Sequence, residues 1–373
     1  MKRILWILML LVAVSVAAQL SAQTGAAKPA APAAKPAEQP KFKAIWERVA
    51  FNKDIDLNAV ACSGPETCWV AGDKSTILHT ADGGKTWQVQ IGGDPDATDR
   101  DLMKIFVLDA QHAWAMTSSG KILGTRDGKT WAELSTVSGT SKGVWFVSPQ
   151  TGFEIENPRS TTETTLNRSD DGGKTWKPIG TCGVETQVDG LPRKLGCWMQ
   201  AAQFLSPTVG FMGGGATVAM GSHVAAFGRT IDGGQTWTTS IIPETKHVIT
   251  GVHFWSDKAG IVVLEKGESV YWTTDAGATW TRSVKQRLWP SAHGVGEGKI
   301  IVSADEDLKQ MGYSFDGGRN FTTRPFAAPA RVRAVTFFDM RNGYLVGDHA
   351  MAYRYRIVPI DYSSPGMIAA MSQ

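Results

Sequence analysis

The 373-residue chain has almost no net charge, because 38 Lys and Arg residues face 35 Asp and Glu residues, which leaves a formal charge of +3. This balance argues against a dedicated nucleic-acid-binding protein, which usually concentrates a basic excess on one face. After the N-terminal segment, long apolar stretches with helical periodicity are also missing. Glycine and tryptophan are frequent instead, with 40 and 14 residues. This composition favours many short strands joined by tight turns.

Signatures of well-known catalytic chemistry are missing too. The sequence contains no HExxH zinc motif and no phosphate-binding loop. The seven histidines are scattered along the chain. We therefore expect no catalytic residues, no cofactor and no metal site. A glycoside hydrolase stays open as the alternative, because two carboxylates that face each other across a cleft leave no signature in sequence.

The first 23 residues are typical of a secretory signal peptide. Lys2 and Arg3 precede an apolar run over Ile4–Ala18, and small residues follow. The alternative is an uncleaved membrane anchor, which usually needs about 20 apolar residues. Residues 24–41 are mostly Ala, Pro, Lys, Gln and Glu, so we expect an extended tether that holds the folded part away from a membrane or is simply disordered. We thus expect an exported protein, periplasmic or extracellular.

Cysteine is scarce, with four residues in the whole chain. An even number of cysteines in an exported protein indicates disulfides. The pairs that are closest in sequence are Cys62–Cys68 and Cys182–Cys197, and neither spacing fits the CxxC pattern of a zinc site. We predict these two disulfides.

The most informative feature is a turn motif, here called the Asp motif, that occurs six times. The first copy is Thr80–Trp87, with the sequence TADGGKTW, and the sixth, Ser314–Phe321, is degenerate. Successive motif aspartates lie 41–45 residues apart, except for one step of 61 residues that contains Cys182 and Cys197. A period in the forties matches one four-stranded blade of a β-propeller. The aspartates and the aromatic residues that end each copy are Asp82 and Trp87, Asp127 and Trp131, Asp171 and Trp176, Asp232 and Trp237, Asp275 and Trp280, and Asp316 and Phe321.

The Asp motif has a structural explanation. Asp-Gly-Gly between two short strands forms a hairpin turn in which glycine supplies positive φ angles. The Asp and Thr side chains can hydrogen-bond the backbone of the turn. The aromatic residue starts the next strand and packs between blades. Six copies at regular spacing indicate a structural role for these aspartates, because one active site does not need six.

The segments between the motifs predict the strands of each blade. First strands are expected at Ala59–Ala61, Ile105–Val107, Val144–Phe146, Val252–Phe254 and Val335–Phe337. A glycine-rich second strand and a third strand follow each of them and lead into the motif.

The last unit, from near Arg331 to Tyr355, lacks the outer strand of a blade. Ala44–Val49 resembles the outer strands that follow the motif, so we expect the N-terminal strand to complete the C-terminal blade and close the ring. Closure removes the exposed sheet edges of an open array. We therefore predict an all-β fold, a single seven-bladed β-propeller of four-stranded antiparallel blades over residues 42–358, of the WD40/YVTN-like type, with a C-terminal tail over residues 359–373.

The signature Ser/Thr-x-Asp-x-Gly-x-Thr-Trp resembles the Asp-box, or bacterial neuraminidase repeat, of sialidases, some endoglucanases, sortilin-type receptors and photosystem II assembly/stability factors. The chain is most similar to the last family and its non-photosynthetic relatives, through Val209–Gly213, Gly343–Gly347 and the fourth motif, TIDGGQTW. The resemblance covers residues 42 to about 358. It implies a lumenal or periplasmic protein that binds a membrane-protein precursor in an assembly or chaperone-like role. The disulfides and the tether depart from the family and leave open a host without a photosystem.

Glycan chemistry is the alternative that the same signature leaves open, either as a sialidase-like or other glycoside hydrolase or as a glycan-binding propeller. Sialidases carry an Arg-Ile-Pro motif ahead of the first Asp-box, whereas here Arg356–Pro359 reads RIVP and stands near the C-terminus. We therefore favour a non-catalytic binding protein. A purely structural module of a cell-surface assembly is the third alternative.

The repeat also predicts a binding surface. In a propeller, the starts of the first strands line the central channel on the face opposite the motif turns. A polar, mildly basic rim at this place can hold an acidic peptide or a loop of a partner, while ordinary solvated loop residues are the other explanation. We expect a protein or peptide partner, no nucleic acid and a monomer. The rim residues are Asn58, Lys142, Gln200, Thr250 and Arg333, with Arg331 adjacent and Arg193 and Lys194 in the insertion.

Overall fold

The computed structural model describes residues 41–49, 51–93, 101–157, 163–188, 191–219, 222–242, 245–265, 270–283, 293–295, 298, 300–304, 310–339 and 341–360. The predicted signal peptide, nearly all of the predicted tether and most of the C-terminal tail lie outside these residues. Within them, no helix has the length and apolar character needed to cross a membrane.

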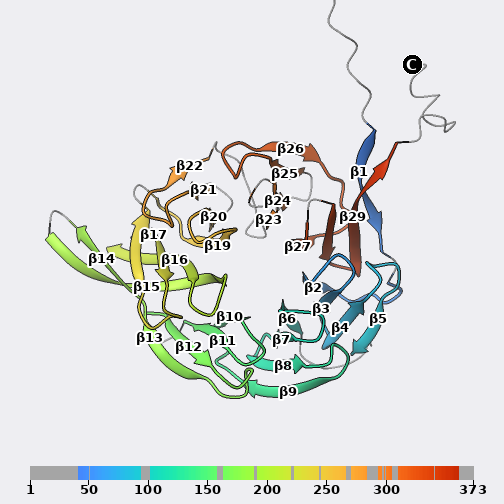
Figure 1. Cartoon of the computed structure of the whole chain (residues 1–373), viewed down its shortest axis with the longest axis horizontal. Helices are drawn as coiled ribbons and strands as arrows, with labels where there is room; N and C mark the ends of the chain where they lie inside the picture. Colours follow the sequence, from blue (N-terminus) through green and yellow to red (C-terminus); the bar gives the residue numbers. More distant parts are fainter. Residues whose placement is uncertain are drawn as a thin grey trace, which may run out of the picture. The chain divides into compact units, whose positions relative to one another are not determined.

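Every regular element of the described residues is a β-strand, and the sheets are antiparallel and follow one another around a ring (Figure 1). The prediction of an all-β propeller built from four-stranded antiparallel blades is confirmed. Four of the sheets have the strand orders β2(Leu57–Cys62)-β3(Cys68–Gly72)-β4(Thr76–Thr80)-β5(Gln88–Ile91), β6(Leu102–Val107)-β7(Ala113–Thr117)-β8(Lys121–Thr125)-β9(Trp131–Thr136), β10(Ser141–Phe146)-β11(Gly152–Glu156)-β12(Thr165–Ser169)-β13(Lys177–Thr181) and β19(Ile249–Phe254)-β20(Gly260–Leu264)-β21(Val270–Thr273)-β22(Thr281–Arg282).

Of the remaining three sheets, one keeps this simple order and the other two differ from it in one way each. The closing sheet takes its outer strand from the N-terminus, and another sheet gains a fifth strand from the insertion. Their orders are β23(His293–Val295)-β24(Ile300–Ala304)-β25(Gln310–Ser314)-β26(Thr322–Pro325), β1(Phe42–Arg48)-β29(Met351–Pro359)-β28(Asn342–Gly347)-β27(Val332–Phe337), and β14(Gly183–Val188)-β15(Leu191–Phe204)-β16(Gly210–Ala219)-β17(Ser222–Thr230)-β18(Thr238–Ile242).

The N-terminal strand closes the ring, as predicted. Strand β1 pairs antiparallel with β29 along its whole length, from Phe42 opposite Pro359 to Arg48 opposite Tyr353. Trp46 anchors the strand, with its ring at 5.3 Å from that of Tyr355 in an edge-on arrangement. Figure 1 shows the first and the last strand of the ring side by side.

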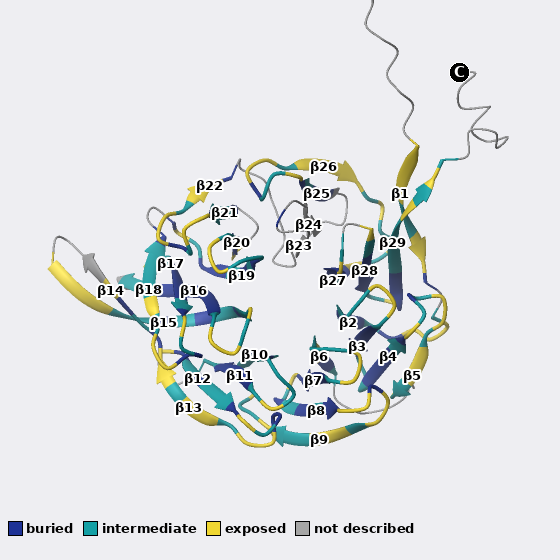
Figure 2. Ribbon diagram, in the orientation of Figure 1, coloured by how far each residue is buried: buried dark blue, intermediate teal, exposed yellow. Residues whose placement is uncertain are grey.

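Neighbouring sheets are joined by stacked aromatic rings. Phe153 of β11 stacks on Phe204 of the next sheet with 3.8 Å between ring centroids, and Phe211 of β16 stacks in the same way on Phe254 at 3.7 Å. Gly210 explains the Gly-aromatic pattern of the second strands, since a Cβ atom there would lie 2.4 Å from the Phe204 ring. The second strands of the sheets are mostly buried, and the outer strands are the more exposed ones (Figure 2).

The Asp motifs form hydrogen-bonded turns. In the first copy, Asp82 Oδ1 accepts the backbone N–H groups of Lys85 and Thr86 at 2.9 and 3.0 Å, and its Oδ2 accepts the Thr86 hydroxyl at 2.6 Å. The turn glycines Gly83 and Gly84 have φ angles of 72° and 81°. In the fourth copy, hydrogen bonds from the side chain and backbone of Thr236 lower the pKa of Asp232 to about 2. These contacts occupy the motif carboxylates within their own turns.

The first five motif turns are also tied to the first hairpin of their own sheets by a backbone hydrogen bond. Gly83 N–H donates to the carbonyl of Glu66 at 2.9 Å, and Ala276 N–H donates to that of Lys258 at 2.8 Å. The motif aromatic residue then contacts the neighbouring sheet, as predicted: the Trp87 ring lies edge-on to Tyr344 of β28 at 5.7 Å.

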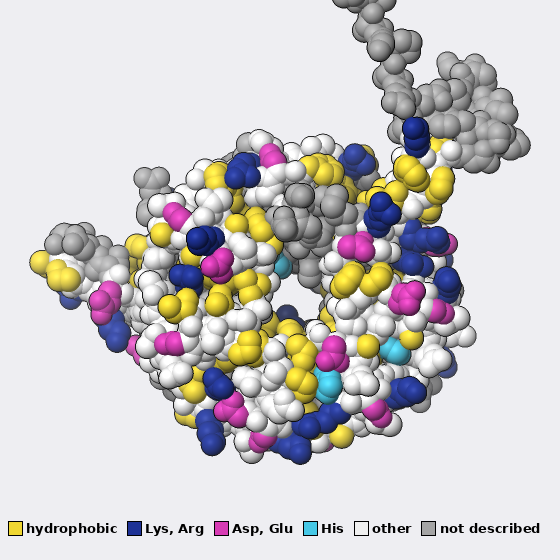
Figure 3. Space-filling model, in the orientation of Figure 1, with side chains coloured by type: hydrophobic (Ala, Val, Ile, Leu, Met, Phe, Trp, Pro, Cys, Tyr) yellow, Lys and Arg dark blue, Asp and Glu magenta, His cyan; other side chains and the backbone are white. Residues whose placement is uncertain are grey.

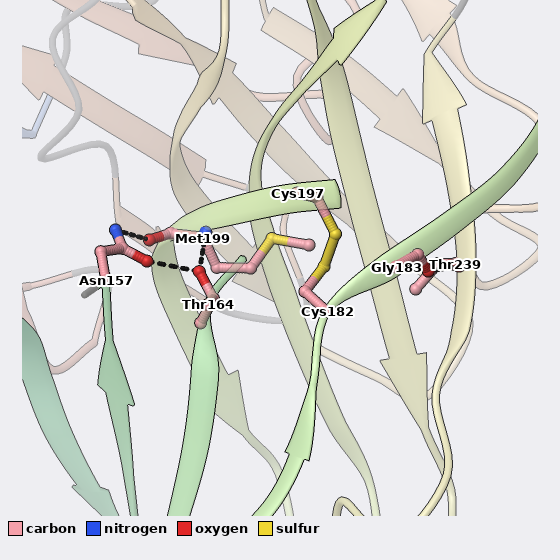
Figure 4. Close-up of a disulfide and its surroundings, with 7 residues drawn as sticks. All are labelled: Asn157, Thr164, Cys182, Gly183, Cys197, Met199 and Thr239. Atoms are coloured by element: carbon pink, nitrogen blue, oxygen red, sulfur yellow. Dashed lines mark hydrogen bonds between the residues drawn. A yellow bond between two sulfur atoms is a disulfide. The ribbon is translucent and has the colours of Figure 1, made fainter. Parts of the chain in front are cut away.

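Both predicted disulfides are present, Cys62–Cys68 and Cys182–Cys197. The second one lies at the base of the insertion, which forms a hairpin of β14 and the first half of β15 that projects from the ring (Figure 1); we call it the arm hairpin, residues 183–196. Figure 4 shows Thr164 beside this disulfide, where its hydroxyl accepts the backbone N–H of Met199 at 2.6 Å.

Candidate functional site

A β-bulge occurs at the same place in the inner strand of most sheets. The pairing shifts by one residue between Ser141 and Gly143 and between Met199 and Ala201, and the same shift recurs in the inner strands of four other sheets. A bulge leaves one residue unpaired and redirects its side chain. The bulged residues are Asn58, Met103, Lys142, Gln200, Thr250 and Arg333. Five of these six are the rim residues that the repeat predicts.

The structure divides these rim residues into two groups. The first group is Asn58 and Arg333, which meet where the ring closes. Arg333 donates to the Asn58 amide oxygen at 2.7 Å and also pairs with Asp56 and Asp348. Asn58 in turn donates to Asp73 Oδ1 at 2.7 Å and to the Leu102 carbonyl at 3.0 Å. Their polar atoms are therefore engaged inside the ring.

The charges around Arg333 reinforce this arrangement. Burial alone would lower the pKa of Arg333, but the hydrogen bond to Asp348 and the negative charges of Asp348 and Asp56 raise the pKa above its ordinary value. Burial raises the pKa of the nearby Asp73, and the negative charges of Asp101 and Asp56 raise it further. A guanidinium that is shared by several carboxylates favours a structural role for Arg333 over the binding of a ligand.

The second group is Lys142, Gln200 and Thr250, which line one cavity of about 250 Å³. The cavity lies among the inner strands β6, β10, β15 and β19, and apolar side chains such as Phe106 and Val252 form much of its wall. We call it the channel cavity. Figure 3 shows an opening at the centre of the ring, bordered in part by hydrophobic side chains.

Lys104 also lines the channel cavity, and sequence reasoning missed it because the aligned position is held by its neighbour Met103. Its side chain is exposed and lines the cavity. Desolvation by the surrounding atoms lowers the pKa of Lys104, and the positive charge of Lys142 lowers it further. Among the described residues, no carboxylate forms an ion pair with either lysine.

The other predicted residues lie away from this cavity. Arg331 is exposed just before β27, and its carbonyl accepts the backbone N–H of Asp348 at 3.0 Å. Arg193 and Lys194 are exposed on the arm hairpin, where Lys194 lies opposite Glu185. The structure thus does not bring the eight predicted residues into one surface.

Glu154 is a second unpredicted residue with unusual chemistry. It lies in the middle of β11 and only 1 % of it is exposed. Asn167 donates to its Oε2 at 2.6 Å. Burial raises the pKa of Glu154 to about 7. The signal in sequence is that the equivalent second-strand positions hold only apolar residues, namely Val70, Ala115, Met212, Val262 and Leu345.

The described part of the chain contains no group of three or more His, Cys, Asp or Glu side chains arranged to hold a metal ion. Asp56 and Asp348 are engaged with Arg333.

Comparison with known proteins gives a consistent picture. Residues 38–188 match the family described as photosynthesis system II assembly factor YCF48. Over 334 residues the chain is 23 % identical to the photosystem II stability/assembly factor HCF136, chloroplastic, of Arabidopsis thaliana, which covers 83 % of this chain and 79 % of that protein. The structure of YCF48 bound to D1 peptide superposes with a TM-score of 0.60 at 17 % identity, covering 85 % of this chain and 97 % of the other.

The chain is a β-propeller that is similar to the photosystem II assembly factors. The expected resemblance is therefore confirmed. The fold itself is shared more widely, since virginiamycin B lyase from Staphylococcus aureus superposes with a TM-score of 0.59 at 13 % identity, covering 85 % of this chain and 100 % of the lyase. Similarity at that level speaks to the fold and leaves function to the individual site.

Proposed function

We propose that this protein is an exported, non-catalytic propeller that binds a protein or peptide, in an assembly or chaperone-like role for a membrane or exported protein. The channel cavity is the observation that carries this proposal. There, bulged residues of three sheets, Lys142, Gln200 and Thr250, present polar groups beside an apolar wall. A small number of polar groups in an otherwise apolar hollow is typical of binding sites.

The relatives support this choice of partner class. HCF136 is described as a stability/assembly factor, and the YCF48 structure contains a peptide of D1. We propose a membrane-protein precursor as the partner of this chain as well, without implying that the host is photosynthetic. The two disulfides support export, because disulfides persist in oxidising compartments.

We also propose that each of the seven sheets in the described residues is one blade of a seven-bladed ring. We further propose that the protein is a monomer and that residues 1–23 act as the signal peptide. An experimental structure would count the blades, size-exclusion chromatography with light scattering would give the oligomeric state, and N-terminal sequencing of the mature protein would locate cleavage.

Cross-linking in the native host tests the binding function. A tagged chain is cross-linked in cells, purified from membranes, and its partners are identified by mass spectrometry. We expect one membrane or exported protein to be enriched with wild type and lost with Lys142→Glu. Lys85→Glu, in an Asp motif turn, is the matched charge reversal and should keep the partner. Equal recovery with both variants would exclude the channel cavity as the binding site.

Glycan chemistry is the alternative to test beside it. A panel of chromogenic glycosides would reveal a hydrolase. If the wild-type protein hydrolyses a glycoside and every cavity variant loses this activity, a hydrolase function replaces the binding proposal.

A further inference from the structure

Lys104 breaks a pattern that the inner strands otherwise keep. The residue directly after the bulge is Ala or Gly in five inner strands, and Lys104 is the exception in β6. The five small residues are Ala59, Gly143, Ala201, Gly251 and Ala334. A lysine at a place where its counterparts are small is a specific feature of this one strand.

The small counterparts leave the room that Lys104 uses. Gly143, Ala201 and Gly251 line the same channel cavity as Lys104. Larger side chains at these places would reduce the volume of about 250 Å³. The cavity is large enough for one or two amino-acid residues, and too small for a folded element.

The charge in this cavity is unbalanced. Desolvation lowers the pKa of Lys104, and repulsion by the positive charge of Lys142 lowers it further. In the described residues, neither lysine has a carboxylate partner. A bound anion would reduce both the desolvation cost and the mutual repulsion of the two ammonium groups.

The rest of the wall selects among anions. Phe106, Met116 and Val252 give the cavity an apolar side, and Gln200 adds an amide that can donate and accept hydrogen bonds. Apolar walls disfavour a strongly hydrated dianion, whereas they stabilise a carboxylate attached to a hydrocarbon group.

We propose that the channel cavity binds a carboxylate next to a short apolar group, with Lys104 and Lys142 as its two cationic contacts. This inference rests on the proposed function and deepens it, because it names the chemical group by which a peptide partner is held. The carboxylate can belong to a chain terminus or to an acidic side chain, and the test separates these sources.

The test uses the full folded chain and four probes in isothermal titration: acetyl-Ala-Leu with a free carboxylate, the same dipeptide as an amide, acetyl-Ala-Asp-Ala-amide, and inorganic phosphate. We expect one or both carboxylate peptides to bind and the dipeptide amide not to bind. Lys104→Met and Lys142→Met should each weaken binding by at least about tenfold, as expected for loss of one charged hydrogen bond. Lys121→Met is the control, since Lys121 pairs with Glu133 on the surface at 2.8 Å.

Binding of the free-terminus dipeptide alone assigns the carboxylate to a chain end, and binding of the aspartate peptide alone assigns it to a side chain. The proposal is overturned if neither binds, if the amide binds equally well, if only phosphate binds, or if Lys104→Met leaves affinity unchanged in a protein that unfolds like wild type.

The proposed function fails in a different way. Intact partner capture together with no binding of either carboxylate peptide removes this inference and keeps the binding function. Carboxylate binding without any cross-linked protein partner keeps the carboxylate site and removes the proposed binding of a protein partner.

Discussion

Arg333 donates to the amide oxygen of Asn58 over 2.7 Å, although the two residues lie 275 positions apart in the chain. The same guanidinium pairs with Asp56 and Asp348. The ring is therefore fastened twice, at its edge by the ladder of β1 and β29 and near the channel by this polar cluster.

Replacing Arg333 should weaken ring closure. Arg333→Lys keeps the positive charge but loses the planar guanidinium, whose several N–H groups donate to Asp56, Asp348 and Asn58 together. With the side chain 27 % exposed, we expect the free energy of unfolding to fall by about 2 kcal/mol. Urea unfolding measures this free energy. The control Arg331→Lys changes an exposed residue nearby and should alter the free energy of unfolding little. Equal stability of both variants would contradict the fastening role.

Glu154 should make the protein less stable as pH rises. Its pKa is raised to about 7 in the folded protein, above the ordinary value of 4.5, so the folded state holds this proton more tightly than the unfolded chain. The resulting stabilisation is complete below pH 4.5 and is lost as pH rises through 7. Glu154→Gln should raise stability at pH 8 by at most about 3 kcal/mol and flatten the profile between pH 4.5 and 8. Parallel profiles of the two proteins would refute this.

The fifth Asp motif carries a strained residue. Ala276 has a φ angle of 64°, where the other motifs place glycine. Ala276→Gly should increase the free energy of unfolding by up to about 1 kcal/mol, because glycine adopts this conformation without a Cβ penalty. Thermal unfolding tests it, and a lower melting temperature than wild type would be the opposite of the expected result.

We expect the motif aspartates to stabilise their turns by accepting hydrogen bonds. Asp171 Oδ1 accepts the backbone N–H groups of Lys174 and Thr175 at 3.0 and 2.9 Å. Asp171→Ala removes both bonds and should cost about 1 kcal/mol, while Asp171→Asn keeps one oxygen acceptor and should cost less. Calorimetry of the two variants measures the difference. The idea fails if Asn is as harmful as Ala.

The two disulfides should contribute unequally to stability. Cys182–Cys197 closes a loop with a separation of 15 residues and Cys62–Cys68 one of 6 residues. Chain-entropy arguments assign about 3 kcal/mol to the first and about 2 kcal/mol to the second. Unfolding of the Cys182→Ala/Cys197→Ala and Cys62→Ala/Cys68→Ala double variants should follow this order. Reducing agent should leave the variant that lacks both disulfides unchanged.

The architecture could be predicted from sequence because the repeat aligns equivalent positions. Asp82 and its counterparts mark one turn per unit, and the missing outer strand at Tyr355 points to Ala44–Val49 as its replacement. The same alignment selected Lys142, Gln200 and Thr250, which line one cavity.

The remaining features depend on exceptions to the repeat and on distant contacts. Asn58 and Arg333 look like exposed rim residues until their partners, up to 277 positions away, are known. Lys104 was missed since it occupies a position that is small elsewhere, and Glu154 since it stands inside an otherwise apolar strand. A charged residue at a place where the repeat has small or apolar ones is the signal that could have found both.

The pairing of Phe42 with Pro359 also has a mechanical consequence. The first residue of β1 and the last residue of β29 lie at the same end of the ladder between these two strands. A load applied between the two ends would therefore peel the hydrogen-bonded pairs apart one after another, starting at Phe42, and would not shear them all at once. The ring would open at its closing sheet while the other sheets stay folded.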